Sequence, residues 1–121
     1  PFLLAAALRL VAAQRLVRRL CPECKALHPE STRIAAHYFL PETQLFRAVG
    51  CAACRGRGYR GRLAIHEVIP AEKFLPLIAA NAPLADLIAL RDRAAHTTLW
   101  QRGLAAAAAG ETTVEEVARV L

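Results

Sequence analysis

The sequence of 121 residues contains no methionine, and its first residue is Pro1. A length of this size suits a single domain, but the missing methionine predicts that the chain is a piece of a longer protein. Aromatic residues make up only 6% of the chain. Modules that bind single-stranded nucleic acid usually offer several stacking rings, whereas Tyr59 is the only aromatic neighbour of the Cys51–Cys54 pair, which argues against that function.

The sequence also lacks a hydrophobic run long enough to span a bilayer. Phe2 to Val17 comes nearest, but Arg9 interrupts it after seven apolar residues and Arg15 follows. Each arginine at mid-bilayer would cost about 2.5–3.5 kcal/mol on insertion scales. There is no signal-peptide pattern either. We therefore expect no transmembrane segment.

Lysine is scarce, so arginine supplies almost all of the positive charge behind the net charge of +6. Many of these arginines lie close to the cysteines, namely Arg15, Arg18, Arg19, Arg55, Arg57, Arg60 and Arg62. Such a cluster favours an anionic partner, for example nucleotide, nucleic acid or lipid headgroups. It is equally typical of a solvated face whose guanidinium stems cover apolar surface.

The chain has four cysteines, all in two Cys-x-x-Cys pairs that we call the first knuckle, Cys21 and Cys24, and the second knuckle, Cys51 and Cys54. This spacing lets both sulfurs of a pair approach one ion, and four such ligands suit tetrahedral Zn²⁺. The alternatives are two short disulfides, a redox dithiol or four separate buried thiols. We predict one structural zinc ion, and a site with four protein ligands is closed to substrate.

Glycines surround the second knuckle at Gly50, Gly56, Gly58 and Gly61. A chain that wraps around a metal needs residues with easy access to positive φ, which glycine supplies. Paired Cys-x-x-Cys motifs also fit a reducing cytoplasm better than an oxidising compartment. We therefore expect a cytoplasmic protein.

The first half of the chain is predicted to combine a helix with short strands. Apolar residues recur at helical spacing and predict an amphipathic helix over residues 1–20, ended by the proline after Cys21. Ser31 is expected to cap a short helix that ends before Pro41. Strands over 45–49 and 62–69 are expected to lead into and out of the second knuckle.

From Pro70 onward the apolar period is helical. Helices are predicted over 71–80 and 84–94, the first of them containing Pro76. Two capping boxes, Thr98 with Gln101 and Thr112 with Glu115, predict two further helices, the first ended by Gly110. The fold class is therefore α+β and mostly helical. Its parts are an amphipathic helix (1–20), a small tetracysteine zinc module with a few short strands (21–61), and a strand with a C-terminal helical subdomain (62–121).

Several blocks of sequence together resemble the C-terminal part of the type II secretion and type IV pilus assembly ATPases. The matching blocks are Pro1-Phe2-Leu3-Leu4, Gln14-Arg15-Leu16-Val17-Arg18, both knuckles with the glycines after Cys54, Ala64-Ile65-His66-Glu67-Val68, Leu99, Gly103-Leu104, Gly110, Thr112-Thr113 and Glu115-Glu116-Val117. The resemblance covers the whole chain, and the order of the blocks is more specific than any single Cys-x-x-Cys pair.

The resemblance implies a part of a homohexameric, RecA-like motor that hydrolyses ATP with Mg²⁺ at the cytoplasmic face of the bacterial inner membrane. Residues 1–20 would then end the ATPase core. The implied partners are the rest of the ATPase, neighbouring subunits and inner-membrane platform proteins. The zinc module would brace the motor and present a docking surface.

The chain departs from the family pattern where the chemistry resides. It has no Gly-x-x-x-x-Gly-Lys-[Ser/Thr] phosphate loop, the element whose backbone cradles nucleotide phosphates. The acidic Mg²⁺ and catalytic-base segments are missing, and Ala95-His96 replaces a glycine-methionine pair. We therefore expect no catalytic residue here, no ATPase activity by this chain alone, and ATP and Mg²⁺ only in a full-length protein.

Three sets of residues are candidates for other roles. Arg55, Arg57 and Arg60 are candidates for contact with an acidic partner surface. Arg15 and Arg18 either approach the nucleotide in the full-length motor or, as we favour, form salt bridges within the core. His66 is favoured as a semi-buried structural residue over a nucleotide or subunit contact, and the remaining histidines lack metal-ligand spacing.

Two other function classes stay open. A nucleic-acid-binding zinc ribbon is suggested by the basic second knuckle, although Tyr59 is its only aromatic neighbour. A zinc-dependent co-chaperone module is suggested by Cys51-x-x-Cys54-x-Gly56-x-Gly58, which resembles one repeat of the cysteine-rich domain of J-domain proteins. That domain needs four such repeats, and the first knuckle here lacks the glycines.

Overall fold

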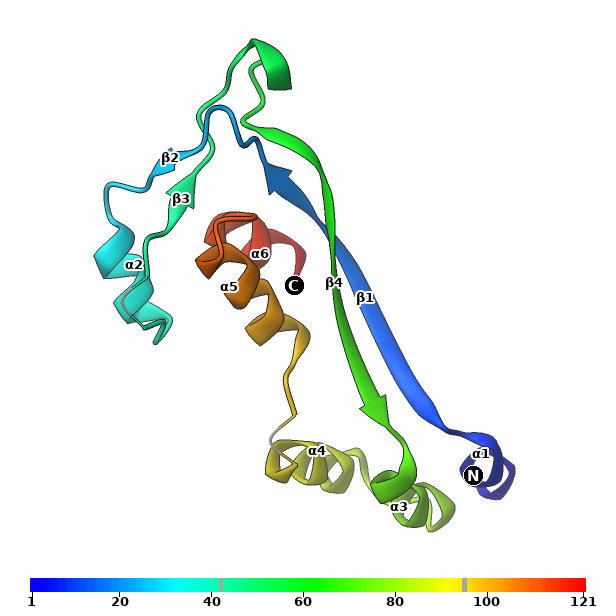
Figure 1. Cartoon of the computed structure of the whole chain (residues 1–121). Coiled ribbons are helices and arrows are strands. Elements are labelled where there is room, and N and C mark those ends of the chain that lie inside the picture. The colour runs from blue at the N-terminus through cyan, green and yellow to red at the C-terminus, as the bar shows by residue number, and fades with distance from the viewer. Residues whose placement is uncertain (42, 95) are drawn as a thin grey trace. The chain divides into compact units, whose positions relative to one another are not determined.

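The computed structural model describes residues 1–41, 43–94 and 96–121. The chain divides into two compact units, the first made of Pro1–Ala13 with His66–Thr98 and the second of Gln14–Ile65 with Leu99–Leu121. Helices and short strands are both present, so the predicted α+β class is confirmed. Two long strands, β1 (Leu10–Leu20) and β4 (Tyr59–Pro70), pair with each other and run in opposite directions (Figure 1).

The first unit is built from short helices at the ends of these strands. The helices are α1 (Phe2–Ala7), the 3₁₀ turn η2 (Glu72–Phe74), α3 (Leu75–Ala79) and α4 (Leu84–Arg93). Pro76 lies in the first turn of α3, where a missing N–H leaves no helical hydrogen bond unmade. The helix predicted over 71–80 is observed as η2 followed by α3, and the one over 84–94 as α4, so both predictions are confirmed.

The second unit contains a small two-stranded sheet and the remaining helices. Its elements besides the β1 and β4 segments are β2 (Ala26–Leu27), α2 (Ser31–His37), β3 (Phe46–Arg47), the 3₁₀ turn η1 (Ala52–Cys54), α5 (Leu99–Ala108) and α6 (Val114–Val120). Strands β2 and β3 pair antiparallel, with Ala26 opposite Arg47 and Leu27 opposite Phe46. The strand predicted over 45–49 is confirmed in its centre, and the one over 62–69 is longer than expected.

The predicted helix over residues 1–20 is wrong after Ala7, because Leu10–Leu20 form strand β1. Alanine, leucine and arginine favour helix locally, but this propensity is overridden by distant partners. The N–H of Arg18 donates to the carboxylate of Glu116, and the N–H of Leu20 donates to the carbonyl of Glu111. A helix would use both N–H groups internally, whereas pairing with β4 leaves them free to bind the C-terminal region.

Two predicted helix caps also need correction. Ser31 is not an N-cap: its hydroxyl accepts a hydrogen bond from the N–H of Leu45 and so ties α2 to the loop before β3. The cap of α6 is Thr113, whose Oγ1 accepts the N–H of Glu116, one position later than the predicted box. The hydroxyl of Thr112 instead donates to the carbonyl of Arg18.

The core of the second unit lies among α2, α5 and α6. Its buried members are Ala35, Leu45, Leu104, Ala107, Val114 and Val117. Gly103 lets α5 approach α6 closely, since a Cβ there would lie 2.8 Å from Cγ1 of Val117. Ala107, only 1% exposed, packs into this core from α5.

Among the residues that the structure describes, no helix is both long and apolar enough to cross a bilayer.

Candidate metal centre

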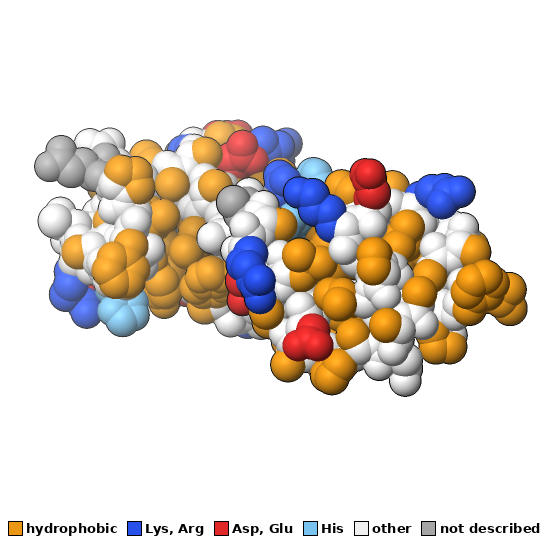
Figure 2. Space-filling model, turned by 90° about the horizontal axis from the view of Figure 1, so that it is seen from below, with side chains coloured by type: hydrophobic (Ala, Val, Ile, Leu, Met, Phe, Trp, Pro, Cys, Tyr) orange, Lys and Arg blue, Asp and Glu red, His pale blue; other side chains and the backbone are white. Residues whose placement is uncertain are grey.

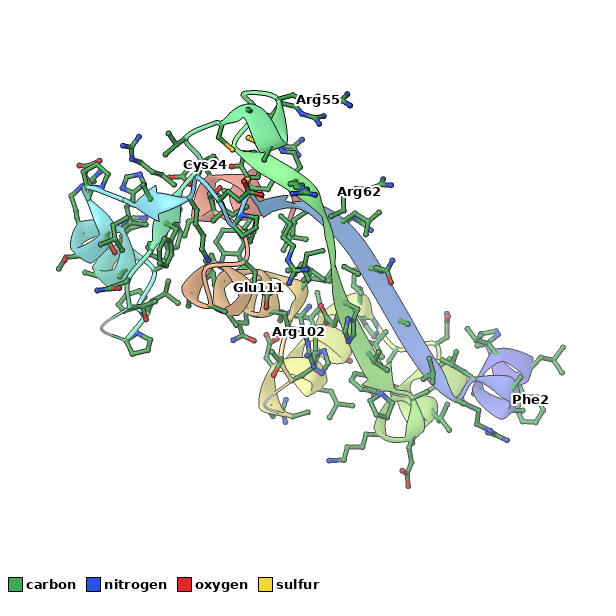
Figure 3. All side chains as sticks on the ribbon, turned by 45° about the horizontal axis from the view of Figure 1, so that its top comes forward. Phe2, Cys24, Arg55, Arg62, Arg102 and Glu111 are labelled. Carbon is green, nitrogen blue, oxygen red and sulfur yellow. The ribbon has the colours of Figure 1, made fainter. Side chains whose placement is uncertain are left out.

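The structure brings the two knuckles together although 26 residues separate Cys24 from Cys51 in the sequence. The four Sγ atoms all lie within 4.8 Å of one another. Cys21 and Cys54 are buried, and Cys24 and Cys51 are half-buried. Figure 3 shows the sulfurs beside η1, at the end where β1 leads into the first knuckle. The cysteines are free, so they form no disulfide.

The spacing of the sulfurs fits a tetrahedral metal ion. The Sγ distances are 3.9 Å from Cys21 to Cys51, 3.8 Å from Cys24 to Cys54 and 3.8 Å from Cys51 to Cys54. Zn–S bonds of about 2.3 Å at the corners of a tetrahedron place neighbouring sulfurs about 3.8 Å apart. A disulfide would require about 2.05 Å. The four cysteines can therefore hold one metal ion with little rearrangement.

Two glycines allow the second knuckle to fold against its surroundings. Gly58 has a φ of 73°, and a Cβ there would lie 2.6 Å from the Cβ of Ala48. Gly50 has a φ of 117°, and a Cβ there would lie 2.6 Å from the carbonyl oxygen of Gly56. Both positions combine a conformation that L-residues avoid with a close approach of backbone. The sequence prediction that glycines shape this loop is confirmed.

Backbone N–H groups point at two of the sulfurs. Gly58 and Cys51 donate to Sγ of Cys54 at 3.2 Å each, and Gly50 donates to Sγ of Cys24 at 3.3 Å. Burial opposes ionisation of Cys54, but these N–H donors outweigh it and lower its pKa to about 6. At Cys24 burial prevails and raises the pKa to about 12. Metal binding needs thiolates, and the N–H donors favour that form.

The buried carboxylate of Glu116 binds β1 three residues before the first knuckle, and the sequence analysis assigned no role to it. Glu116 is 1% exposed and accepts hydrogen bonds from the backbone and guanidinium of Arg18 and from the guanidinium of Arg119. Burial disfavours its charge, but the bonds from Arg119 and Arg18 outweigh burial and lower its pKa to about 2. The prediction that Arg18 forms a salt bridge within the core is confirmed.

The sequence contains a weak indication that Glu116 is buried. Glu116 occupies the first turn of α6 between inward-facing Val114 and Val117, so a helical wheel places it on the apolar face. The guanidinium of Arg18 also lies 4.2 Å from the centre of the Tyr59 ring, a cation–π distance. These contacts give Arg18 a structural role beside the metal site.

The three arginines proposed as partner contacts are all exposed. Arg60 forms an ion pair with Glu23 of the first knuckle at 3.4 Å. The Nε of Arg57 donates to the carbonyl of Cys54 at 3.2 Å. Figure 3 shows the side chain of Arg55 extending away from the ribbon of η1. These arginines thus surround the second knuckle, and Arg60 is partly neutralised.

The other candidate residues are not gathered at the metal centre. Arg15 is exposed, donates to the carbonyl of Gln14 and takes part in no ion pair among the described residues, so the salt bridge within the core favoured for it is wrong. His66 is exposed and belongs to the first unit, so the predicted semi-buried position is wrong. His96 contacts Glu67 at 2.8 Å within that unit, and His28 lies 3.5 Å from Glu115 in the second.

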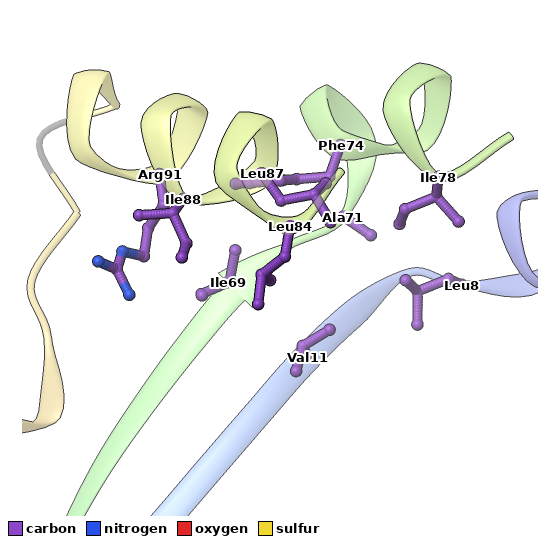
Figure 4. A pocket seen from close by; sticks show the side chains of 10 residues that line it. All are labelled: Leu8, Val11, Ile69, Ala71, Phe74, Ile78, Leu84, Leu87, Ile88 and Arg91. Carbon is purple, nitrogen blue, oxygen red and sulfur yellow. The ribbon is translucent and has the colours of Figure 1, made fainter. Parts of the chain in front are cut away.

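The first unit carries an apolar groove of about 340 Å³, shown in Figure 4. Leucine, isoleucine, valine and phenylalanine side chains line it, with the charged Arg91 beside them. One of the lining residues, Leu84, is 70% exposed. In Figure 2, hydrophobic side chains spread over the face that carries α3 and α4. This unit has apolar surface but no group that could hold a metal within its described residues.

Comparisons with known proteins agree with the sequence resemblance. Residues 1–119 match the family described as type II/IV secretion system protein. Type II secretion system protein E of Aeromonas hydrophila is 42% identical over 99% of this chain, which spans 25% of that relative. The type IV pilus assembly ATPase PilB of Myxococcus xanthus is 39% identical over 97% of this chain, and the match covers 22% of the length of PilB.

A third relative, type II secretion system ATPase E of Vibrio cholerae, is 36% identical over 99% of this chain, and the match covers 24% of the length of that relative. The chain thus spans about a quarter of the length of each of these relatives. Because the family match runs over nearly every residue, including both knuckles, this chain belongs to the type II/IV secretion system protein family.

Proposed function

We propose that this chain is the zinc-binding, C-terminal region of a cytoplasmic hexameric ATPase that powers type II secretion or type IV pilus assembly. Cys21, Cys24, Cys51 and Cys54 are its zinc ligands. Its role is structural and partner-docking, and the nucleotide chemistry belongs to a full-length protein. The predicted division into 1–20, 21–61 and 62–121 remains our proposal for how the chain joins the ATPase core, the zinc module and the helical subdomain.

The observation that carries this proposal is the tetrahedral spacing of the four sulfurs in a member of the secretion family. Cysteine thiolates in this geometry prefer Zn²⁺ among common cellular divalent metals. Four protein ligands leave no open position for substrate, so the site supports a scaffold. The N–H donors to Cys24 and Cys54 add the outer-shell support that structural metal sites use.

Native mass spectrometry with elemental analysis tests the metal. We expect one zinc per chain, none in Cys51→Ser, and full occupancy in Arg62→Gln as a surface control near the same loop. A purified chain that holds no zinc after expression with zinc, and binds none on titration, would refute the zinc assignment.

Nucleotide turnover tests the non-catalytic role. The sequence supplies no phosphate loop, so we expect no ATPase activity and no saturable ATP binding by calorimetry. Micromolar binding of ATP to the isolated chain would contradict this. In a full-length ATPase, removal of the four sulfurs should reduce pilus or pseudopilus assembly while leaving the phosphate loop intact.

The arginines around the second knuckle are the proposed docking surface for an acidic face of the inner-membrane platform protein. Charges at a rim act mainly on the association rate, and the effect fades with salt. Arg55→Gln with Arg57→Gln should therefore slow association with the platform protein more than it speeds dissociation, whereas Arg33→Gln on α2 should change neither rate. Unchanged rates would assign these arginines to the solvated surface. Oligonucleotide binding that survives about 200 mM salt would favour a nucleic-acid function instead.

A further inference from the structure

The turn between α5 and α6, residues 109–113, is hydrogen-bonded to the chain on both sides of the first knuckle. The carbonyl of Glu111 accepts the N–H of Leu20 at 2.8 Å. The carbonyl of Gly110 accepts from Nζ of Lys25 at 2.9 Å. Leu20 directly precedes the first knuckle and Lys25 directly follows it. The α5–α6 turn therefore binds the backbone where the chain enters this pair of ligands and the Lys25 side chain where it leaves.

The same turn also holds the exit from the second knuckle. Oγ1 of Thr113 and the hydroxyl of Tyr59 are hydrogen-bonded at 2.9 Å. Tyr59 follows Gly58, whose N–H donates to Sγ of Cys54 and whose carbonyl accepts the N–H of Cys21. Three of the four chain segments that flank the ligands are thus held by a turn about 50–90 residues away in sequence.

The two threonines of the turn are buried, although the contacts themselves are only partly so. Thr112 is 0% and Thr113 is 2% exposed, and Thr112 donates to the carbonyl of Arg18 at 2.8 Å. At Gly110, whose φ is 70°, a Cβ would lie 3.0 Å from the ring of Phe46. Loss of a buried hydrogen-bond partner leaves a desolvated group unpaired. Undocking of the turn would therefore leave buried polar groups of Thr112 and Thr113 without their partners.

We propose that the α5–α6 turn is a positioning element for the metal site, so that docking of the turn and binding of the metal are thermodynamically coupled. This inference rests on the proposed zinc function. Cysteine ligands bind tightly only when their sulfurs are held close to the required geometry, and the turn restrains the backbone on which three of them depend. Coupling of this kind is reciprocal: metal should order the turn, and a loosened turn should weaken metal binding.

The first test measures zinc affinity by competition with a chromophoric chelator. Thr112→Val keeps the shape of the side chain and removes its bond to Arg18, and Thr112 touches no cysteine. We expect the zinc dissociation constant to rise about tenfold, within the range of about 5–150-fold that is typical of coupling between two sites. Thr32→Val, the same change at an exposed position of α2, should alter it less than twofold. Equal constants for the two variants would overturn the proposal.

A second test separates coupling from a general loss of stability and does not depend on Thr112→Val folding. Hydrogen exchange of the unaltered chain with and without zinc should show metal-dependent protection of the Leu20 amide and of α6, besides the knuckles. Tyr59→Phe should reduce that protection, whereas Leu40→Ala, which removes core packing at the end of α2, should leave the zinc-dependent difference unchanged. Protection confined to the knuckles refutes the coupling but leaves zinc binding intact, while a chain that binds no zinc refutes the proposed function itself.

Discussion

The two compact units contain similar apolar residues but bury them to very different extents. Within the described residues, the second unit buries a cluster of six residues among α2, α5 and α6 and closes the cysteine site beside it. In the first unit Ala71 is the one buried residue, and its groove is open and apolar. The second unit therefore has a hydrophobic core of its own, whereas packing within the first unit contributes little to its stability.

The largest difference should come from removal of the metal. A structural zinc site contributes about 10–16 kcal/mol in zinc-finger peptides at neutral pH, which is comparable with the net stability of a whole domain. Cys51→Ser or a chelator should therefore expose the amides of residues 21–61 to hydrogen exchange. Amides of the first unit should change little, because all four sulfurs belong to the second unit. Uniform deprotection of both units would break the comparison.

A matched pair of leucine truncations tests the contrast in packing. Leu104 is 7% exposed and Leu84 is 70% exposed. Leu104→Ala should cost about 2–5 kcal/mol of unfolding free energy, as buried leucines do, while Leu84→Ala should stay within about 0.5 kcal/mol. Urea denaturation of the two zinc-loaded variants measures both values. Similar losses at the two positions would show that the first unit has a core of its own.

The buried carboxylate of the second unit should give that unit a pH dependence. The pKa of Glu116 falls from 4.5 to about 2 on folding, so its stabilisation is complete above about pH 5 and is lost as the pH falls towards 2. A shift of this size corresponds to about 3 kcal/mol. Glu116→Gln should remove the stabilisation at pH 7 and flatten the acid limb of thermal melts.

The control for this cluster is an exposed ion pair in the same unit. Glu30 pairs with Arg33, and its side chain is 54% exposed. Exposed pairs contribute between zero and about 1 kcal/mol, so Glu30→Gln should leave both the stability at pH 7 and the acid limb nearly unchanged. An acid limb that persists in Glu116→Gln would assign the pH dependence to other groups.

The smallest contrast lies between two glycines near the second knuckle. Gly58 and Gly61 have φ values of 73° and 80°, but a Cβ at Gly61 meets no atom within 4 Å. Gly61→Ala should cost about 1–2 kcal/mol, the penalty of a left-handed conformation. Gly58→Ala adds a contact of 2.6 Å with Ala48 and should cost about 1–3 kcal/mol more. Thermal melts of the zinc-loaded variants check the order.

The gathering of the four cysteines was largely predictable from the sequence because its signal is local. Two Cys-x-x-Cys pairs and the glycines around Cys51 and Cys54 indicate a four-sulfur site without knowledge of the fold, since the spacing within each pair already determines how two sulfurs meet one ion. The helices after Pro70 were predictable for the same reason. The spacing of apolar residues and the positions of prolines determine helix formation through interactions over only a few residues.

Only the tertiary structure decided the conformation of Leu10–Leu20 and the role of Glu116. Local propensity favours a helix in the first case, but β1 instead pairs with strand β4, and the N–H of Leu20 donates to the carbonyl of Glu111, 91 positions away in the sequence. In the second case the charge of Glu116 is stabilised by Arg18, 98 positions away in the sequence. The sequence alone determined which atoms can bind a metal, whereas the distant hydrogen bonds that hold them in place arise only when the chain is folded.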